Sequence, residues 1–302
     1  MGDGKVLSLF SALKFIIHHP INKDHKTAAL IRYAKWQIGS RLVTGPVIFP
    51  WIDGTKFIVR PGETGFTQNI YCGLHEFQDM AYILHVITPN DLFIDVGANV
   101  GSYTILACAA RGARGYCFEP IPATYQKLLE NLQINNLSAR VKPFNIGISD
   151  KECDLLFTSD KNTMNHVIAN EEKSSNAINV HVSTLDQVLA DESPTVLKID
   201  VEGFETKVIN GAIHTLENRS LHSIIMETNK SNQRYGYEGE QLIHTIKSKG
   251  FQTYTYEPNQ RKLNPYGDEE PRGNNSLFIR DANLVMERIS KATIIGVYNC
   301  KL

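Results

Sequence analysis

Several features that would point to a function at once are scarce in this chain of 302 residues. Its five cysteines are odd in number and show no C-x-x-C spacing, which argues against a disulfide framework and a cysteine-rich zinc site. Its 31 basic and 32 acidic residues leave a net charge of -1, so no global field favours nucleic acid or an anionic membrane. Lys14 interrupts the apolar patch from Val6 to Ile17, and no other apolar run is long enough to span a bilayer. We therefore expect a cytoplasmic protein with reduced cysteines and no transmembrane segment.

The first 56 residues predict a helical and hairpin extension. Apolar residues recur at helical spacing in the first segment, at Leu7, Phe10, Leu13 and Ile17. They predict a helix that docks on the rest of the protein, in preference to one that lies on a membrane surface. A second helical pattern runs from Lys23 to Ile38, and two β-rich segments, 47–51 and 56–60, flank an Asp53-Gly54 turn.

From Asp91 onward, short β-rich segments alternate with amphipathic ones, which is typical of an α/β domain whose parallel sheet is covered by helices on both faces. Seven strands are expected, at Leu92–Val96, Gly115–Phe118, Val141–Ile146, Val196–Ile199, Ser223–Glu227, Phe251–Tyr256 and Ser276–Ile279. Helices are expected at Tyr103–Ala110, Ala123–Ile134, Glu205–Leu216 and Glu240–Lys249. We place this domain at residues 57–281, with a hairpin or lid in the polar insertion at 150–183 and a C-terminal tail at 282–302.

A glycine turn after the first of these strands predicts a nucleotide site. The segment from Phe93 to Thr104 runs from a buried strand through Gly97 and Gly101 into a helix. Glycines allow the turn unusual φ angles and let a ligand approach the backbone, while the helix start offers free N–H groups. The plain alternative is that both glycines serve only tight packing between strand and helix.

The residues around this turn indicate which nucleotide it binds. Glu119 ends the next strand, about twenty residues on, where its carboxylate is placed to accept both ribose hydroxyls. The alternative is a solvated strand end. Asn99 and Ser102 stand where a dinucleotide motif needs glycines, which argues against NAD. A turn that carries side chains suits the ammonium and carboxylate of S-adenosylmethionine instead, and we expect Asp95 to help hold the ammonium.

With these residues in view, the chain resembles the FkbM family of S-adenosylmethionine-dependent methyltransferases over roughly residues 57 to 280. The motifs that carry the resemblance are Gly73-Leu-His-Glu76, Asp95-Val-Gly-Ala-Asn-Val-Gly101, Phe118-Glu-Pro120, Thr184-Leu-Asp186, Lys198-Ile-Asp-Val-Glu-Gly-Phe-Glu205, Gly211 and Met226-Glu227. The resemblance implies the class I Rossmann-like methyltransferase fold. It also implies methyl transfer from S-adenosylmethionine, with S-adenosylhomocysteine as the product, to an oxygen of a sugar, glycan or other hydroxylated small molecule.

The catalytic hypothesis rests on the end of the fourth strand. Asp200 and Glu202 follow it, at the carboxyl edge of the sheet where open α/β sheets place their ligands. An alcohol acceptor needs a group that takes its proton, so we expect Asp200 to position or deprotonate the acceptor and Glu202 to orient it or the sulfonium. In the structural alternative, Lys198 pairs with one carboxylate and the other caps the next helix. A further alternative is a Mg²⁺ site on Asp200, Glu202 and Glu227.

Four other residues have both a functional and a structural interpretation. Asn145 ends the third strand and is placed to meet the adenine edge, or simply forms a turn. Glu76 is expected to close over the methionine end of the cofactor, or is a solvated acid at a helix start. His166 and His181 lie in or beside the insertion and are alternative bases, although a lone histidine is more often structural.

Two rival functions stay open. An N-methyltransferase acting on an amine or peptide would need less proton management, and a protein of the same fold could bind the cofactor without turnover. Nucleic acid is not the expected acceptor, because the chain has no basic stripe interleaved with aromatics; the nearest cluster is only Arg234-Tyr235-Gly236-Tyr237.

Overall fold

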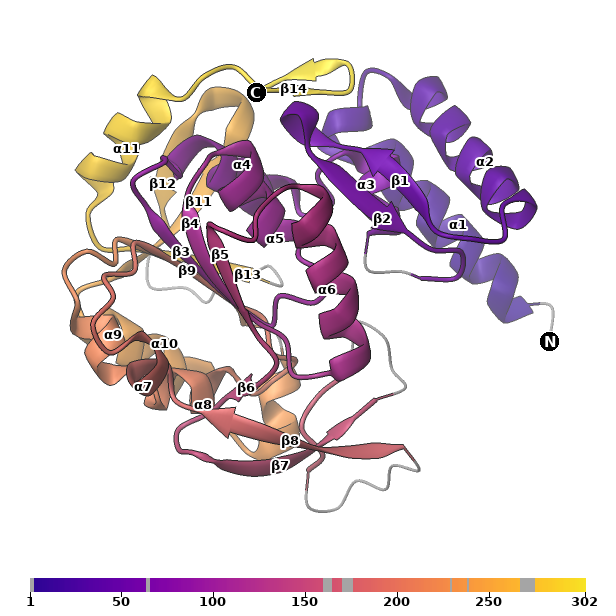
Figure 1. The fold of residues 1–302 in the computed structure, drawn as a ribbon. Coiled ribbons are helices and arrows are strands. Elements are labelled where there is room, and N and C mark those ends of the chain that lie inside the picture. Colours follow the sequence, from indigo (N-terminus) through magenta and orange to yellow (C-terminus); the bar gives the residue numbers. More distant parts are fainter. Residues whose placement is uncertain are drawn as a thin grey trace.

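A computed structural model describes residues 3–63, 66–159, 165–169, 176–228, 230–237, 239–266 and 275–302. In this part of the chain the main sheet has eight strands, in the order β12-β11-β13-β10-β9-β3-β4-β5 (Figure 1). They are β3 (Leu92–Val96), β4 (Arg114–Phe118), β5 (Val141–Phe144), β9 (Val196–Ile199), β10 (Ser223–Glu227), β11 (Gln252–Glu257), β12 (Lys262–Pro265) and β13 (Asn275–Ile279).

The sheet confirms the predicted α/β class with a mostly parallel sheet. The strands β10, β9, β3, β4 and β5 run parallel, while β13 lies antiparallel between β10 and β11. All seven expected strands are present within a few residues. The count of seven was one too low for the described residues, because the chain reverses at Arg261, which has a φ of 50°, and adds β12 at the edge.

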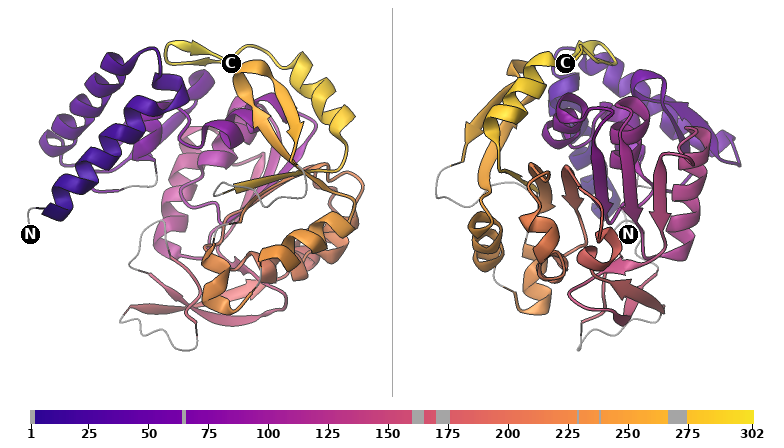
Figure 2. Two further views of the ribbon diagram at one scale, coloured as in Figure 1. Left: turned by 180° about the vertical axis from the view of Figure 1, so that it is seen from behind. Right: turned by 60° about the vertical axis from the view of Figure 1, so that its left-hand side comes forward.

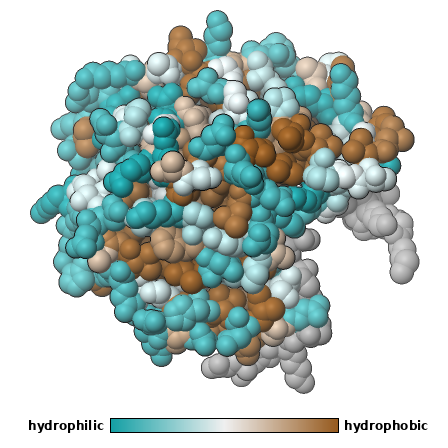
Figure 3. Space-filling model, in the orientation of Figure 1, coloured by the Kyte–Doolittle hydropathy of each residue, from teal (hydrophilic) through white to brown (hydrophobic). Residues whose placement is uncertain are grey.

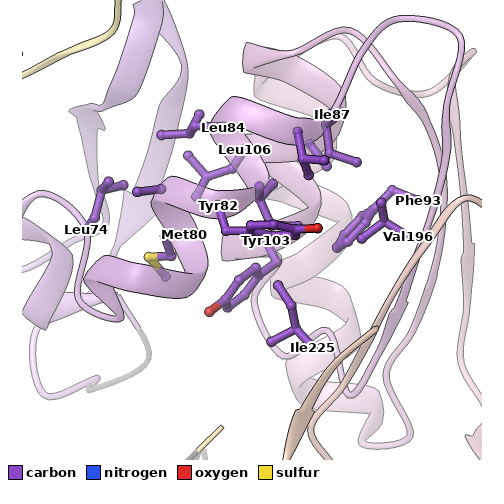
Figure 4. Packing of buried hydrophobic residues seen from close by; sticks show 14 of the residues in the cluster. Leu74, Met80, Tyr82, Leu84, Ile87, Phe93, Tyr103, Leu106, Val196 and Ile225 are labelled. Atoms are coloured by element: carbon purple, nitrogen blue, oxygen red, sulfur yellow. The ribbon is translucent and has the colours of Figure 1, made fainter. Parts of the chain in front are cut away.

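Helices cover both faces of the sheet, as expected (Figures 1 and 2). One face packs on α4 (Phe77–Val86), α5 (Ser102–Thr104), α6 (Pro122–Ile134) and α11 (Ala282–Lys291). The other packs on α7 (Leu185–Leu189), α8 (Glu205–Asn210), α9 (Ile213–Glu217) and α10 (Gly239–Ser248). Every residue of β3 and β9 is buried, which matches their mainly apolar sequences; Asp95 and Lys198 are the charged exceptions. Figure 4 shows Phe93 and Val196 of these strands in one cluster with Tyr82 and Leu84 of α4.

Two expected helices differ from the prediction. The segment from Tyr103 is helical, but α5 passes into a π-helical turn at Ile105–Ala110. The helix expected at Glu205–Leu216 is divided into α8 and α9 at Gly211. A Cβ on Gly211 would lie 2.0 Å from the carbonyl oxygen of Ser149, so this contact requires glycine where a continuous helix would favour another residue.

The N-terminal residues form the expected helices and hairpin. They comprise α1 (Asp3–His18), α2 (Lys26–Leu42), β1 (Val47–Pro50) and β2 (Lys56–Val59), followed by α3 (Thr67–Cys72). The predicted docking face of α1 is wrong at one position. Ile16 is only 1% exposed and makes the contact, whereas Phe10 is 67% exposed. No helix in the described ranges has the length and apolar character needed to cross a membrane.

The polar insertion contains the expected hairpin. Strands β7 (Cys153–Thr158) and β8 (Ala177–Ser183) pair antiparallel, and β6 (Gly147–Ile148) adds a third strand beside β8. Within this insertion, residues 160–164 and 170–175 lie outside the described part of the chain. The hairpin leaves the main sheet just after β5 and projects beyond its carboxyl edge (Figure 1).

The residues from 282 onward are integrated with the core. Val285 and Ile289 of α11 are buried against α4, and the chain ends in a small hairpin of β14 (Gly296–Val297) and β15 (Cys300–Lys301). Arg288 donates from Nη1 to the buried Asp91 carboxylate, at 2.9 Å from Oδ2, just before β3 begins. This ion pair ties α11 to the first strand of the sheet.

The substitution Arg288→Met should lower the free energy of unfolding by about 3 kcal/mol, because it leaves the buried Asp91 carboxylate without its cation. Lys291→Met on the same helix is the control. Its ion pair with Glu287 is exposed and should contribute less than about 1 kcal/mol. Urea unfolding compares the two variants, and equal midpoints would contradict a supporting role for α11.

Candidate active site

The predicted glycine turn lies beside the turn that carries the predicted catalytic residues Asp200 and Glu202. We name this second turn the catalytic turn. Strands β3 and β9 are parallel neighbours, so both turns follow at the same edge of the sheet, where the strand order reverses. Gly97 has a φ of 81° and Asn99 a φ of 51°, which are left-handed values. A Cβ on Gly97 would lie 1.8 Å from the carbonyl oxygen of Asp200. The site is therefore held together by backbone packing.

The same contact supports the plain interpretation of the glycines. Gly101 has a φ of 95°, and a Cβ there would lie 2.7 Å from Cδ1 of Leu128 on α6. Packing against the backbone thus requires glycine at Gly97, whereas at Gly101 the left-handed φ favours it. Gly97 also lines the two cavities described below. The packing interpretation and the ligand-binding interpretation of this glycine are therefore compatible.

Glu119 is not a solvated strand end. Its side chain is 6% exposed, and it accepts hydrogen bonds from the backbone N–H of Asn99 at 3.0 Å and of Ile121 at 2.9 Å. Burial raises the pKa of Glu119 to about 7, although these two hydrogen bonds act in the opposite direction. The structure therefore holds this carboxyl group fixed at the cavity wall.

Two cavities meet at these turns. The first, which we name the apolar chamber, lies under the β7–β8 hairpin beside Glu119. Its apolar lining residues are Phe118, Ile121, Ile146, Ile148, Phe157, Val167, Val201 and Phe204. The second, which we name the acidic chamber, is lined by the charged residues Glu76, Asp95, Lys198, Asp200, Glu202 and Glu227. Gly97, Asn99, Asp200 and Glu202 line both chambers and mark where they join.

The acidic chamber concentrates carboxyl groups in a buried place. Burial raises the pKa of Asp95 to about 6. Burial, with the negative charges of Asp200, Glu205 and Glu202, raises that of Glu227 to about 9. Burial and the neighbouring Asp200 also raise the pKa of Glu202. Each shift has the sign expected where negative charge lacks compensation, so the chamber favours a cationic ligand.

Lys198 is the buried cation that partly balances these acids. Its Nζ lies 3.0 Å from Oδ2 of Asp200 and 5.0 Å from the ring centre of Tyr103. Burial acts to lower the pKa of Lys198, but the attraction of Asp200 and Glu76 outweighs it and raises the pKa. The first half of the structural alternative thus holds, since Lys198 does pair with one carboxylate.

The structural alternative also expected the second carboxylate, Glu202, to hold the start of the next helix. Another residue, Glu205, has this role. Glu202 has a φ of 55° and lines both chambers. The buried Glu205 accepts hydrogen bonds from the N–H groups of Val201 and Gly203, at 3.2 Å each, and so holds the turn. Glu202 is therefore left to face the cavities.

Glu76 and Asp95 are held in the acidic chamber by specific hydrogen bonds. Glu76 precedes α4 and accepts from the Tyr103 hydroxyl at 3.0 Å and from Nδ2 of Asn275 at 2.8 Å. It is half-buried and does not cap the helix, so the simple interpretation as a solvated helix-start acid is wrong. Asp95 accepts from Oγ1 of Thr104 at 2.6 Å.

Three other candidates lie away from the chambers. Asn145 donates from Nδ2 to the carbonyl oxygens of Glu119 and Pro120, at 2.8 and 3.1 Å, as a turn former does. His181 is half-exposed and contacts Asp154 and Glu152 on the hairpin. Asn145, His181 and the buried His166 are not among the described residues that line the two chambers.

The magnesium alternative finds no support in the arrangement of side chains. Within the described ranges no group of three or more His, Cys, Asp and Glu side chains is placed to hold a metal ion. Asp200, Glu202 and Glu227 thus do not form such a group. All five cysteines are free thiols.

Comparison with known proteins identifies the family. The model described as "Methyltransferase FkbM domain" matches residues 95–253, which include the glycine turn, Glu119 and the catalytic turn. The chain belongs to the FkbM methyltransferase family. The matched range is narrower than the resemblance inferred over residues 57 to 280, and it leaves Glu76 outside.

Individual relatives of this FkbM protein are distant. Hexuronic acid methyltransferase AglP of Haloferax volcanii is 27% identical over 150 residues, which cover 48% of this chain and 59% of that protein. Methyltransferase 1 of Beauveria bassiana is 26% identical over 164 residues, which cover 45% and 64%. The chain therefore spans less than two thirds of the length of these relatives. The crystal structure of methyltransferase FkbM from Methylobacillus flagellatus has a TM-score of 0.44 at 16% identity, covering 64% of this chain and 44% of that one.

Sequence patterns missed several residues in and around the acidic chamber. Asn275 comes from the antiparallel strand β13 and reaches Glu76 only through the fold. Tyr103 was expected only as the start of a helix, and the burial of Lys198 depends on α4 and α5 above it. No local sequence pattern marks Asn275. Lys198 does have such a pattern, because a lysine inside the otherwise apolar strand Val196–Ile199 predicts a buried, paired cation.

The substitution Gly97→Ala should prevent the two turns from packing, because the new Cβ would overlap the Asp200 carbonyl. Gly54→Ala is the matched control, since Gly54 also has a positive φ, 78°, but has no atom within 4 Å of the new Cβ. Gly54→Ala should cost about 1 kcal/mol of stability from backbone strain alone. Thermal unfolding should show a clearly larger loss for Gly97→Ala, and equal losses would contradict the packing constraint.

Proposed function

We propose that this chain is an S-adenosylmethionine-dependent methyltransferase that acts on a hydroxyl group of a sugar or other small glycan. One observation carries the proposal: an apolar chamber with a fixed carboxyl group opens into a chamber rich in acids. S-adenosylmethionine has an adenosine at one end and carries positive charge on its sulfonium and ammonium. A dinucleotide would instead bring a pyrophosphate, which the acids of the second chamber would repel.

The residues present fit this cofactor. Gly97, which has no side chain, lies where the two chambers join, and Glu119 is placed to accept the ribose hydroxyls. Asp95 and Glu76 are placed to hold the cationic end. When bound, the cofactor supplies a methyl group on a sulfonium, which an oxygen nucleophile displaces in line.

Residues of the catalytic turn are placed to remove the proton from the acceptor hydroxyl. We propose that Glu202 takes the proton from the hydroxyl and that Asp200 orients the acceptor, which reverses the division expected from the sequence. Lys198 holds Asp200 in an ion pair at 3.0 Å. Burial and the charge of Asp200 raise the pKa of Glu202, which makes it the stronger proton acceptor.

The sugar acceptor is inferred by analogy. One relative, AglP of Haloferax volcanii, is a hexuronic acid methyltransferase, and that substrate belongs to AglP. This similarity makes hexuronic acids and neutral glycosides the first compounds to test, and the carboxyl groups of the acidic chamber favour the neutral ones. A polar cavity with several carboxyl groups suits hydroxyl-rich ligands, because each carboxylate can accept hydrogen bonds from hydroxyls.

Calorimetric titration with S-adenosylmethionine should give specific binding, with NAD as the negative control. Glu119→Gln should weaken binding by about tenfold or more, since charge-assisted hydrogen bonds to the ribose are lost. Glu130→Gln, at a half-exposed glutamate of α6, should leave binding unchanged. Binding of NAD, or of neither compound, would contradict the proposed cofactor.

Cofactor binding should also depend on pH. The pKa of Glu119 is about 7 in the free protein, and the ionised form accepts both ribose hydroxyls. The dissociation constant should therefore rise by up to about tenfold for each pH unit below 7 and level off above it. Glu119→Gln should remove the part of this dependence that Glu119 contributes and leave the smaller part due to Asp95, whose pKa is raised to about 6. A dissociation constant that is flat between pH 5.5 and 8, about the range in which this group changes charge, would contradict it.

Transfer of a radiolabelled methyl group to a panel of hexuronic acids and glycosides tests the catalytic turn. Glu202→Gln should lower kcat by about 100-fold or more and leave the affinity for S-adenosylmethionine unchanged. Asp200→Asn should lower kcat and also stability, because it leaves the buried Lys198 without its partner. Full activity in Glu202→Gln would favour methylation of an amine, and cofactor binding without transfer to any acceptor would favour a non-catalytic protein.

A further inference from the structure

Exposed hydrophobic side chains are concentrated in the N-terminal elements. Of the eleven large hydrophobic residues that are exposed in the described part of the chain, eight belong to residues 10–48. They are Phe10, Phe15, Leu30, Ile31, Ile38, Leu42, Val43 and Ile48. Figure 3 shows hydrophobic side chains gathered at the upper right, over the β1–β2 hairpin and the adjoining end of α2.

Helix α2 carries the most regular part of this surface. Ile31, Ile38 and Leu42 are separated by seven and four residues, which places them within about 40° of one another around the helix. Their outward side chains are 50%, 61% and 78% exposed. The opposite side of α2 packs on α1 and α3, so this stripe is not needed for the fold. A free apolar stripe on a helix that is already packed indicates a partner.

The charges beside the stripe are all of one sign. Helix α2 contains four Lys or Arg and no Asp or Glu, and Lys35 and Arg41 are exposed next to the apolar residues. Residues 1–46 hold seven basic and two acidic residues, whereas the remainder of the chain holds 24 and 30. The near-neutral total thus hides a basic N-terminal unit on an acidic body.

We propose that this face, formed by the outer side of α2 with Val43 and Ile48, docks on the surface of an anionic lipid membrane. Apolar side chains flanked by Lys and Arg match a bilayer interface, where acyl chains accept the former and lipid phosphates the latter. The face corresponds to a helix lying in the interface rather than spanning it. It differs from the sequence-based expectation, in which the N-terminal segment only docks on the protein.

A second copy of the chain is a less suitable occupant. A two-fold interface would place the same surface on both sides and bring Lys35 and Arg41 of each copy together, with no acid of α2 to offset the repulsion. Lipid headgroups supply the opposite charge across the whole face. Association of copies is therefore an outcome that the experiment must separate from lipid binding.

The position of this face has a consequence that rests on the proposed function. A cavity between α1, α2 and α3 is lined by Phe15, Tyr33, Trp36 and Arg41, and it shares Gln68 and His75 with the acidic chamber. A docked protein would thus be able to receive an acceptor that carries a lipid tail through the side nearest the membrane. Membrane docking itself does not require methyl transfer.

Co-sedimentation with vesicles tests the proposal without cofactor or acceptor. The full chain should pellet with vesicles of phosphatidylcholine and phosphatidylglycerol in about a two-to-one ratio, and about tenfold less with pure phosphatidylcholine. High salt should weaken this binding. Lys35→Glu combined with Arg41→Glu should abolish the preference for anionic vesicles, whereas Lys291→Glu on α11 should retain it.

The apolar contribution has its own matched variants. Ile38→Glu combined with Leu42→Glu should lower binding to the anionic vesicles by at least about tenfold. Leu156→Glu is the control, because Leu156 is 53% exposed on β7, at the other end of the molecule (Figure 1). All these side chains are exposed, so circular dichroism should show unchanged folding.

Wild-type protein that pellets with neither vesicle would overturn the proposal, as would equal binding by the Ile38/Leu42 variant. Light scattering without lipid gives the remaining outcome: a dimer that the same variant dissociates would assign the face to a second copy and overturn membrane docking. Failure of S-adenosylmethionine to bind would refute the proposed function and leave these vesicle results unaffected.

Discussion

The backbone of Gly97 lies against the carbonyl of Asp200, and a side chain of any size on Gly97 would separate them. This contact joins the turn after β3 to the turn after β9. It therefore sets how far Glu119, whose carboxylate is held by the N–H of Asn99, lies from Asp200 and Glu202. Two parallel strands alone would bring the turns to the same edge, but the missing Cβ lets the backbones touch.

A shortage of positive charge gives the site its chemical character. Five carboxyl groups line the acidic chamber, and Lys198 is the one lysine or arginine among the residues that line it. Burial disfavours the ionised forms of these carboxyl groups. A cation that enters the chamber favours their ionised forms and is attracted to the resulting carboxylates. The same arrangement disfavours phosphate-bearing ligands. Selection between S-adenosylmethionine and a dinucleotide thus depends on the whole chamber and not on the glycine pattern alone.

The sequence predicted the features that depend on neighbouring residues. The strand and glycine turn at 92–101, the hairpin in the insertion and Glu119 at the end of β4 each have a local pattern, and the structure contains all of them. Features that depend on distant contacts were missed. The division of α8 from α9 follows from a contact between Gly211 and Ser149, and Asn275 reaches Glu76 from the distant strand β13. The edge strand β12 follows a turn at a non-glycine residue, Arg261, which gave no warning.

A crystal structure of the protein with S-adenosylhomocysteine would test the central claim most directly. The account predicts the adenine in the apolar chamber beneath the β7–β8 hairpin, the ribose hydroxyls on Glu119 and the amino group in the acidic chamber near Asp95 and Glu76. A ligand that binds elsewhere, or that lies in these chambers with Glu119 touching neither hydroxyl, would contradict it.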